Sequence, residues 1–132
     1  MIGLVIATHS NLAIELINAS EMIIGKVNNA VAVCIQKEDS VEKIREEIAH
    51  AIETVGSDGD GVMVMTDMFG GTPANIAISF LEPEKVEVIT GVNLPMVIKV
   101  LNSQEGMSLQ ELGSMLKAYG QQSIFQASEF LQ

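Results

Sequence analysis

The sequence has no tryptophan, one tyrosine and one cysteine in 132 residues, whereas methionine occurs eight times. One cysteine cannot form a disulfide within the chain, and Cys34 lies in an apolar run, which favours a small buried side chain over a reactive thiol. Because aromatic residues are scarce, the core is predicted to be aliphatic and rich in methionine.

Positive charge is also scarce. Seven Lys and Arg residues face seventeen Asp and Glu residues, so the formal net charge is -10 and the isoelectric point is near 4.4. Such a surface repels a polyanion, and nucleic acid is therefore not expected as a partner. No apolar run reaches the roughly twenty residues that cross a membrane, and residues 1–7 lack a basic leader and a cleavage site, so we expect a cytoplasmic protein.

Several catalytic motifs are missing. The chain has neither the glycine-rich loop that holds ATP nor the Gly-x-Gly-x-x-Gly dinucleotide fingerprint, and no spacing of Cys or His suits zinc. No serine lies in a Gly-x-Ser-x-Gly elbow, so a hydrolase would lack its usual nucleophile. We predict no metal site and no cofactor, which leaves a metal-dependent hydrolase a weak alternative.

The chain is rich in apolar residues. Its 48% hydrophobic residues are enough to build the core of one domain over residues 1–132. Short apolar runs rich in β-branched residues alternate with segments of helical periodicity. The predicted strands are 2–7, 31–35, 62–65 and 86–90, each followed by a predicted helix, and a last helix is predicted over 109–119. Because each strand is apolar throughout, we predict an α/β fold whose parallel sheet is covered by helices on both faces.

Local signals predict where several helices begin and end. Asp39 and Glu42 have the spacing of a capping box, Thr72 before Pro73 predicts an N-cap, and Gly120 predicts the end of the last helix. Residues 121–132 fit either a strand or a helix.

Ligands of a parallel α/β sheet gather beyond the carboxyl ends of the strands, where the strand order reverses. Four polar groups occupy these ends, at 8–10, 36–38, 66–72 and 91–94. The first and third groups supply a histidine and an aspartate, His9 and Asp67. If the first and third strands are neighbours, these two side chains face each other.

Such a pair has a chemical meaning. A histidine that donates one ring N–H to a carboxylate keeps a lone pair on the other nitrogen and is held in a fixed orientation, so it is a ready nucleophile. Gly70 and Gly71 bring backbone N–H groups close to an anion just before a predicted helix beginning at Thr72. We predict that a phosphoryl group on His9 is held there.

The residues alone also allow simpler interpretations. His9 can be a polar surface residue, Asp67 can cap a turn, and Gly70-Gly71 can form a turn with positive φ. His50 and the acidic residues between 38 and 53 are interpreted as the solvated side of a helix, without a role in metal binding.

Five stretches of the chain match one protein family in its order. They are Ile6-Ala-Thr-His-Ser10, Ala19-Ser-Glu-Met-Ile-Ile-Gly25, Gly59-Asp-Gly-Val62, Thr66-Asp-Met-Phe-Gly-Gly-Thr-Pro-Ala-Asn75 and Thr90-Gly-Val-Asn-Leu-Pro-Met96. At these residues the sequence resembles the IIA component of the mannose/fructose/sorbose family of the bacterial phosphoenolpyruvate-dependent sugar phosphotransferase system (PTS).

The resemblance implies a phosphotransferase component in which His9 Nε2 accepts a phosphoryl group from phospho-HPr and passes it to a IIB component, with Asp67 bonded to the other ring nitrogen. Membrane IIC and IID partners would then act on the sugar. It also implies a three-layer sandwich of sheet order 2-1-3-4, and a homodimer in which residues 121–127 form an exchanged edge strand. Thr72 matches a Ser/Thr of the phosphate loop, whereas Met68 stands where some members carry threonine, which removes that hydroxyl contact.

Several relatives continue into a fused IIB domain, whereas this sequence stops after its IIA-like part, so the IIB partner is expected to be a separate protein. The alternative is a stand-alone regulatory dimer whose phosphorylation state signals to a partner protein. Sugar specificity is expected to reside in the membrane partners, because in this interpretation the domain touches only proteins and a phosphoryl group.

Overall fold

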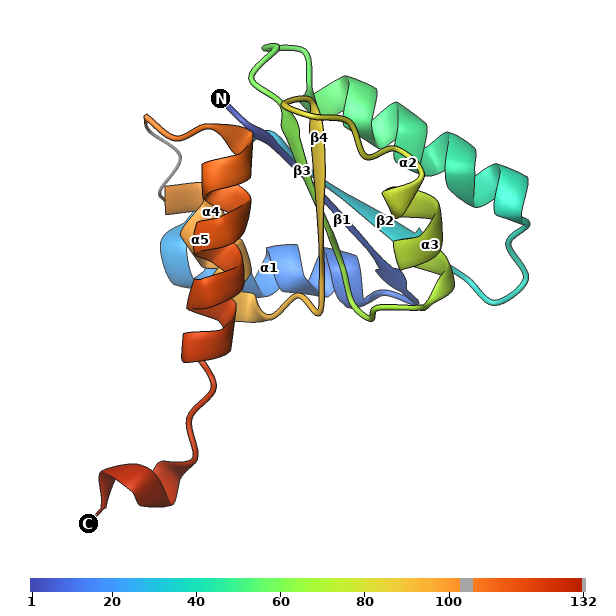
Figure 1. Cartoon of the computed structure of the whole chain (residues 1–132). Helices are drawn as coiled ribbons and strands as arrows, with labels where there is room; N and C mark the ends of the chain where they lie inside the picture. The colour runs from blue at the N-terminus through green and yellow to red at the C-terminus, as the bar shows by residue number, and fades with distance from the viewer. Residues whose placement is uncertain (103–105, 132) are drawn as a thin grey trace.

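The structure, a computed structural model, describes residues 1–102 and 106–131 (Figure 1). Strands β1 (Gly3–His9), β2 (Ala30–Ile35), β3 (Val62–Thr66) and β4 (Val86–Thr90) form one parallel sheet in the order β2-β1-β3-β4. The predicted strands and the strand order implied by the resemblance are confirmed.

Helices cover both faces of the sheet and make three layers (Figure 1). One layer holds α1 (Leu12–Ile24), α4 (Leu94–Asn102) and α5 (Leu109–Gln122), and the other holds α2 (Val41–Val55) and α3 (Thr72–Ile78). Within the described residues, no helix combines the length and the apolar character needed to cross a bilayer.

The central strands bury side chains on both of their faces, because alternate residues of a strand point in opposite directions. In β1, Leu4 and Ile6 pack under α1 and α4, whereas Val5 and Ala7 pack under α2 and α3. All four side chains are fully buried. This two-sided burial explains why β1 and β3 contain hardly any polar residues, and it leaves their carboxyl ends as the places where polar side chains emerge.

The predicted capping box at the start of α2 is wrong. Ser40 is the N-cap, and its hydroxyl accepts a hydrogen bond from the backbone N–H of Lys43 at 3.1 Å. Asp39 does not cap the helix, because its carboxylate accepts from the backbone N–H of Gln36 at 2.8 Å and from Lys43 Nζ at 2.9 Å. Asp39 therefore shapes the turn before the helix.

Two other predicted helix ends are shifted. Gly71, not Thr72, is the N-cap of α3, and Thr72 is its first helical residue. The helix predicted to end at Gly120 continues to Gln122. Gly120 stays helical because it packs against Met96, and its carbonyl accepts from the side-chain amide of Asn93 at 3.1 Å.

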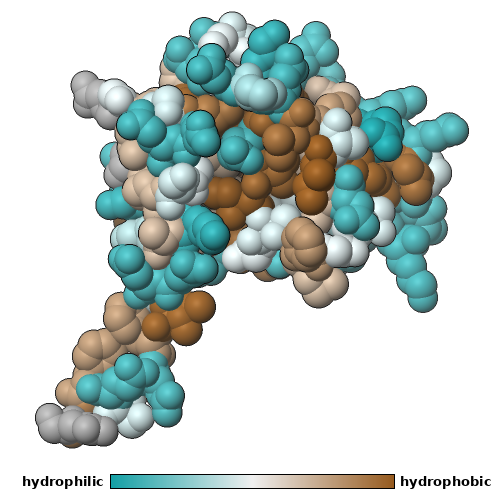
Figure 2. All heavy atoms as spheres, in the orientation of Figure 1, coloured by the Kyte–Doolittle hydropathy of each residue, from teal (hydrophilic) through white to brown (hydrophobic). Residues whose placement is uncertain are grey.

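The end of the chain leaves the body of the protein (Figure 1). After α5 the only regular element among the described residues is a short 3₁₀ helix, η1 (Ala127–Phe130), so the edge strand expected over 121–127 does not form within the single chain. This tail carries apolar side chains (Figure 2), and those more than half exposed are Ile124, Phe125, Phe130 and Leu131.

Gly3 is expected to be a sensitive point of the fold. A Cβ at this position would lie 2.4 Å from the carbonyl oxygen of Val55 and 2.6 Å from its Cβ, because the end of α2 packs directly on the β1 backbone. Overpacking of this kind costs roughly 1–3 kcal/mol, so Gly3→Ala is expected to lower the free energy of unfolding by about 2–3 kcal/mol in urea titrations. The control is Gly113→Ala within α5, where the nearest atom is the flexible side chain of Glu87 at 3.3 Å. Equal stability of the two variants would contradict the packing argument.

Candidate active site

His9 and Asp67 lie side by side at the carboxyl edge of the sheet. His9 is the last residue of β1, and Asp67 follows the last residue of β3, which is paired in parallel with β1. His9 Nδ1 lies 2.9 Å from Asp67 Oδ2, and the backbone N–H of His9 donates to the same oxygen at 3.1 Å. The structure thus brings together the two side chains predicted to meet there.

The contact orients the imidazole. An ionised carboxylate only accepts hydrogen bonds, so Nδ1 carries the proton and Nε2 keeps its lone pair. The His9 side chain is 50% exposed, whereas that of Asp67 is 16% exposed. The carboxylate is therefore a largely enclosed anchor, and Nε2 is the ring nitrogen available to an external electrophile.

The glycine loop lies against the same ring. A Cβ on Gly71 would be 2.9 Å from His9 Cε1 and 3.5 Å from His9 Nε2, so the Gly71 backbone is close to the free edge of the imidazole. Gly70 has φ +86°, a conformation that glycine adopts without strain. Helix α3 has only seven residues, so the case for an anion here rests on the approach of the Gly71 backbone more than on a helix dipole.

A pocket of about 460 Å³ opens beside His9. Its lining residues come from the ends of β1 and β2 with the turns that follow them, from α2 and from the start of α3, and they are His9, Ser10, Ile35, Gln36, Lys37, Asp39, Ile44 and Thr72. Thr72 is exposed and lines this pocket.

The chain reverses sharply after His9. Ser10 has φ 54°, the left-handed region, and its N–H donates to the carbonyl of Ile35 at 2.7 Å. Buried Thr8 accepts from the backbone N–H of Ala13 at 2.7 Å and so helps to begin α1 in place of a side-chain bond from Asn11. In the sequence, residues 8–10 stand out only because they follow a predicted strand. No sequence pattern indicated the hydrogen bonds made by Thr8 and Ser10.

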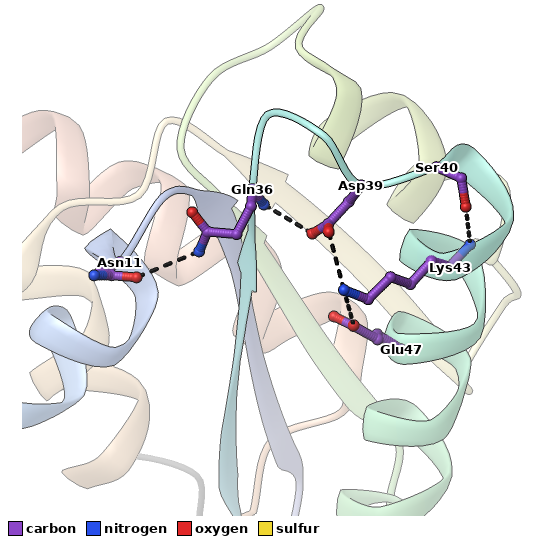
Figure 3. Close-up of polar contacts among 6 residues, drawn as sticks. All are labelled: Asn11, Gln36, Asp39, Ser40, Lys43 and Glu47. Atoms are coloured by element: carbon purple, nitrogen blue, oxygen red, sulfur yellow. Dashed lines mark hydrogen bonds and ion pairs between the residues drawn. The ribbon is translucent and has the colours of Figure 1, made fainter.

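The turn after β2 is braced by side chains (Figure 3). Asp39 accepts from the Gln36 N–H and from Lys43 Nζ, and the Gln36 side chain donates to Asn11 Oδ1 at 3.4 Å. The Gln36 hydrogen bond, helped by Lys43, lowers the pKa of Asp39, and the Asp39 contact raises the pKa of Lys43. Sequence reasoning did not predict this brace, since Asp39 was assigned to a capping box and Gln36 only to the polar group after a strand.

Other candidate groups lie apart from this site. His50 is exposed on α2, and Cys34 is half-buried in β2. Across the residues that the structure describes, no three His, Cys, Asp or Glu side chains converge as a metal site would require.

Comparisons with known proteins match this arrangement to one family. Residues 3–117 match the family model described as EIIA-man, PTS system fructose IIA component. The chain is 36% identical over its whole length to the PTS system fructose-specific EIIA component of Bacillus subtilis, of which it covers 90%. It is 28% identical over 93% of its length to the PTS system mannose-specific EIIAB component of Escherichia coli, of which it covers only 38%. The fold matches the mannose/sorbose specific IIA subunit of the phosphotransferase system from Enterococcus faecalis with a TM-score of 0.83 at 26% identity, covering 95% of this chain and 93% of that one.

Proposed function

The chain belongs to the EIIA-man family of PTS IIA components, which are phosphotransfer proteins of sugar uptake, and from this premise we propose that His9 is the residue that carries the phosphoryl group. The observation that carries the proposal is the 2.9 Å contact between His9 Nδ1 and Asp67, which leaves Nε2 free beside the Gly71 backbone. Phospho-HPr is the proposed donor, and a separate IIB component is the proposed acceptor.

The proposed step exchanges one N–P bond for another. The lone pair of His9 Nε2 attacks the phosphorus of the donor phosphohistidine, the donor N–P bond breaks, and its electron pair returns to the donor nitrogen. The Nδ1 proton stays on His9, where Asp67 stabilises the positive charge that the ring acquires. The backbone of Gly70, Gly71 and Thr72 is proposed to hold the phosphoryl oxygens. Transfer to a histidine of IIB repeats the step in the opposite sense.

The surface around His9 suits protein partners. Phe69 is 78% exposed and Met68 is 58% exposed, and both belong to the loop that carries Gly71 past the His9 ring. Exposed apolar side chains next to a reactive group favour docking of another protein over binding of a small polar molecule. We therefore propose that HPr and IIB bind over this loop in the cytoplasm, and that IIB passes the phosphoryl group to sugar entering through membrane IIC and IID.

A homodimer is also proposed. A groove of about 470 Å³ runs along the open edge of β4 and is lined by Val88 and Ile89 of the strand and by Ile124 of the tail. Figure 2 shows apolar surface on this face and on the projecting tail. An unpaired edge strand beside an apolar tail supports exchange of the tail between two copies, in which the partner copy would cover the edge.

Labelling tests the proposed phosphotransfer. The purified protein is incubated with phosphoenolpyruvate, enzyme I and HPr, and its intact mass is measured. We expect one added phosphate that requires HPr and is lost in acid, because phosphohistidine is acid-labile. Absence of label under conditions that charge a control IIA protein would contradict the proposal and favour a regulatory binding role.

Gly71→Ala is expected to slow phosphorylation without unfolding the protein. Gly71 has φ −78° and ψ 166°, which alanine adopts freely, so the backbone is not strained. The new Cβ would press on His9 Cε1 at 2.9 Å and displace the ring from Asp67. Because small misplacements of reacting groups cost up to about 100-fold in rate, we expect a loss of about 10–100-fold in initial rates of labelling. An unchanged rate would show that the ring tolerates the displacement.

A further inference from the structure

The pocket beside His9 has a positively charged residue that the proposed mechanism does not use. Lys37 lines this pocket together with His9 and Thr72. It lies in the turn between β2 and α2. Because the sheet order is β2-β1-β3-β4, this turn flanks His9 on one side, whereas the loop after β3, which carries Asp67, flanks it on the other. Lys37 is exposed and therefore open to a group arriving from outside.

The turn that carries Lys37 is fixed relative to His9. Asp39 closes the turn through the Gln36 N–H at 2.8 Å, and Gln36 reaches across to Asn11 in the turn after β1 (Figure 3). At the base of the turn, the carbonyl of Ile35 accepts from Ser10, the residue next to His9. The segment around Lys37 is thus closed by the contact between Gln36 and Asp39. Its beginning, at Ile35 and Gln36, is also bonded to the turn that follows His9.

The other lysine near the pocket, Lys43, is already engaged by carboxylates. Lys43 contacts Asp39 at 2.9 Å and Glu47 at 3.8 Å, and Asp67 is paired with His9. Among the described residues, no hydrogen bond or ion pair engages the side chain of Lys37. In a chain of net charge -10 this leaves an unpaired lysine on the pocket that His9 also lines.

We propose that Lys37 binds the phosphoryl group carried by His9 and thereby speeds its arrival from the donor. The inference rests on the proposed function, because it assumes that His9 is phosphorylated. Phosphoryl transfer depends on positioning and on neutralising the charge of the three equatorial oxygens, which a lysine ammonium does as a point charge. Lys37 forms no covalent bond and keeps its proton, so the exchange of N–P bonds at His9 is balanced without it.

Two variants and a matched control separate this role from general electrostatics. Lys37→Gln removes the charge and Lys37→Arg keeps it. Lys26→Gln makes the same change in net charge on an exposed lysine of the α1–β2 connection, at the amino-terminal end of the strands and so away from His9. Each protein also carries His50→Ala, because phosphoramidate would label this exposed histidine too. It is phosphorylated chemically with phosphoramidate, and the phosphoryl group on His9 is titrated by ³¹P NMR. Loading by phospho-HPr is then measured at several salt concentrations, with thermal unfolding to check that the variants are folded.

A nearby cation favours the dianionic phosphoryl group, so its loss raises the pKa of that group. We expect Lys37→Gln to raise the pKa of the phosphoryl group by about one unit relative to the wild type. The pKa in Lys37→Arg and in Lys26→Gln should stay close to the wild-type value. We also expect Lys37→Gln to load about tenfold more slowly with a flatter salt dependence. Identical titrations and loading rates for Lys37→Gln and Lys26→Gln would overturn the proposal. If phosphoramidate labels the wild type and phospho-HPr does not, the proposed function fails, while the titration still decides whether Lys37 contacts the phosphoryl group.

Discussion

A His9→Ala protein is expected to gain no phosphate from phosphoenolpyruvate, enzyme I and HPr, under conditions in which the wild type gains one. The reason is that Nε2 of His9 is the nucleophile of the proposed step, and alanine offers no lone pair. The backbone N–H of residue 9 still donates to Asp67, so the loop keeps one of its two contacts with that carboxylate. Intact mass spectrometry provides the measurement.

The matched control for this experiment is His50→Ala. His50 is the other histidine of the chain and is exposed on α2. We expect it to be labelled like the wild type, because its side chain lines no part of the His9 pocket. Because half-exposed side chains contribute little to stability, the free energy of unfolding of His9→Ala should lie within about 1 kcal/mol of the wild-type value. Residual labelling of a folded His9→Ala protein would place the phosphoryl group on another residue.

The architecture of the sheet was predictable because burial on both faces leaves a strong mark in the sequence. A strand such as β1 excludes polar residues until the sheet ends, so the change from Ala7 to Thr8 and His9 marks its carboxyl end. Helices followed from periodicity, as in α2, where Ile44, Ile48 and Val55 form the buried stripe. These signals are local, and each needs only a few neighbouring residues to be read.

Helix ends and the tail were less predictable, since tertiary contacts decide them. Gly120 is a typical terminator, yet Met96 and Asn93 hold it inside α5. Asp39 has the chemistry of a cap, yet Gln36 and Lys43 compete for its carboxylate. The edge strand implied by the resemblance would form only against a second copy of the chain. The exchange of this strand between two copies stays a prediction.

In the candidate site, too, some features were predictable from the sequence and others were not. His9 and Asp67 were predicted to meet because each lies at the carboxyl end of a strand, and the order of strands sets their separation. The approach of Gly71 to the ring was not predictable in detail, because it depends on the path of a whole loop. Lys37 lies in the strand-end group 36–38 but was given no role, since nothing in a charge-rich segment marks the one lysine that lines the pocket with His9. Their functional roles stay predictions until the variants are measured.

Asp67→Asn is expected to lower the rate of His9 phosphorylation by about 10–100-fold, by analogy with the loss when the carboxylate partner of a metal-bound histidine is replaced. Asparagine is nearly isosteric, and its amide oxygen can still accept from Nδ1, so the loss isolates the charge that stabilises the phosphorylated ring. The control is Glu53→Gln, which removes one negative charge from an exposed position on α2. Initial rates of labelling by phospho-HPr, measured beside urea unfolding, distinguish a catalytic loss from misfolding. Equal rates for Asp67→Asn and Glu53→Gln in folded proteins would mean that Asp67 only positions the imidazole, and that its negative charge does not assist the transfer.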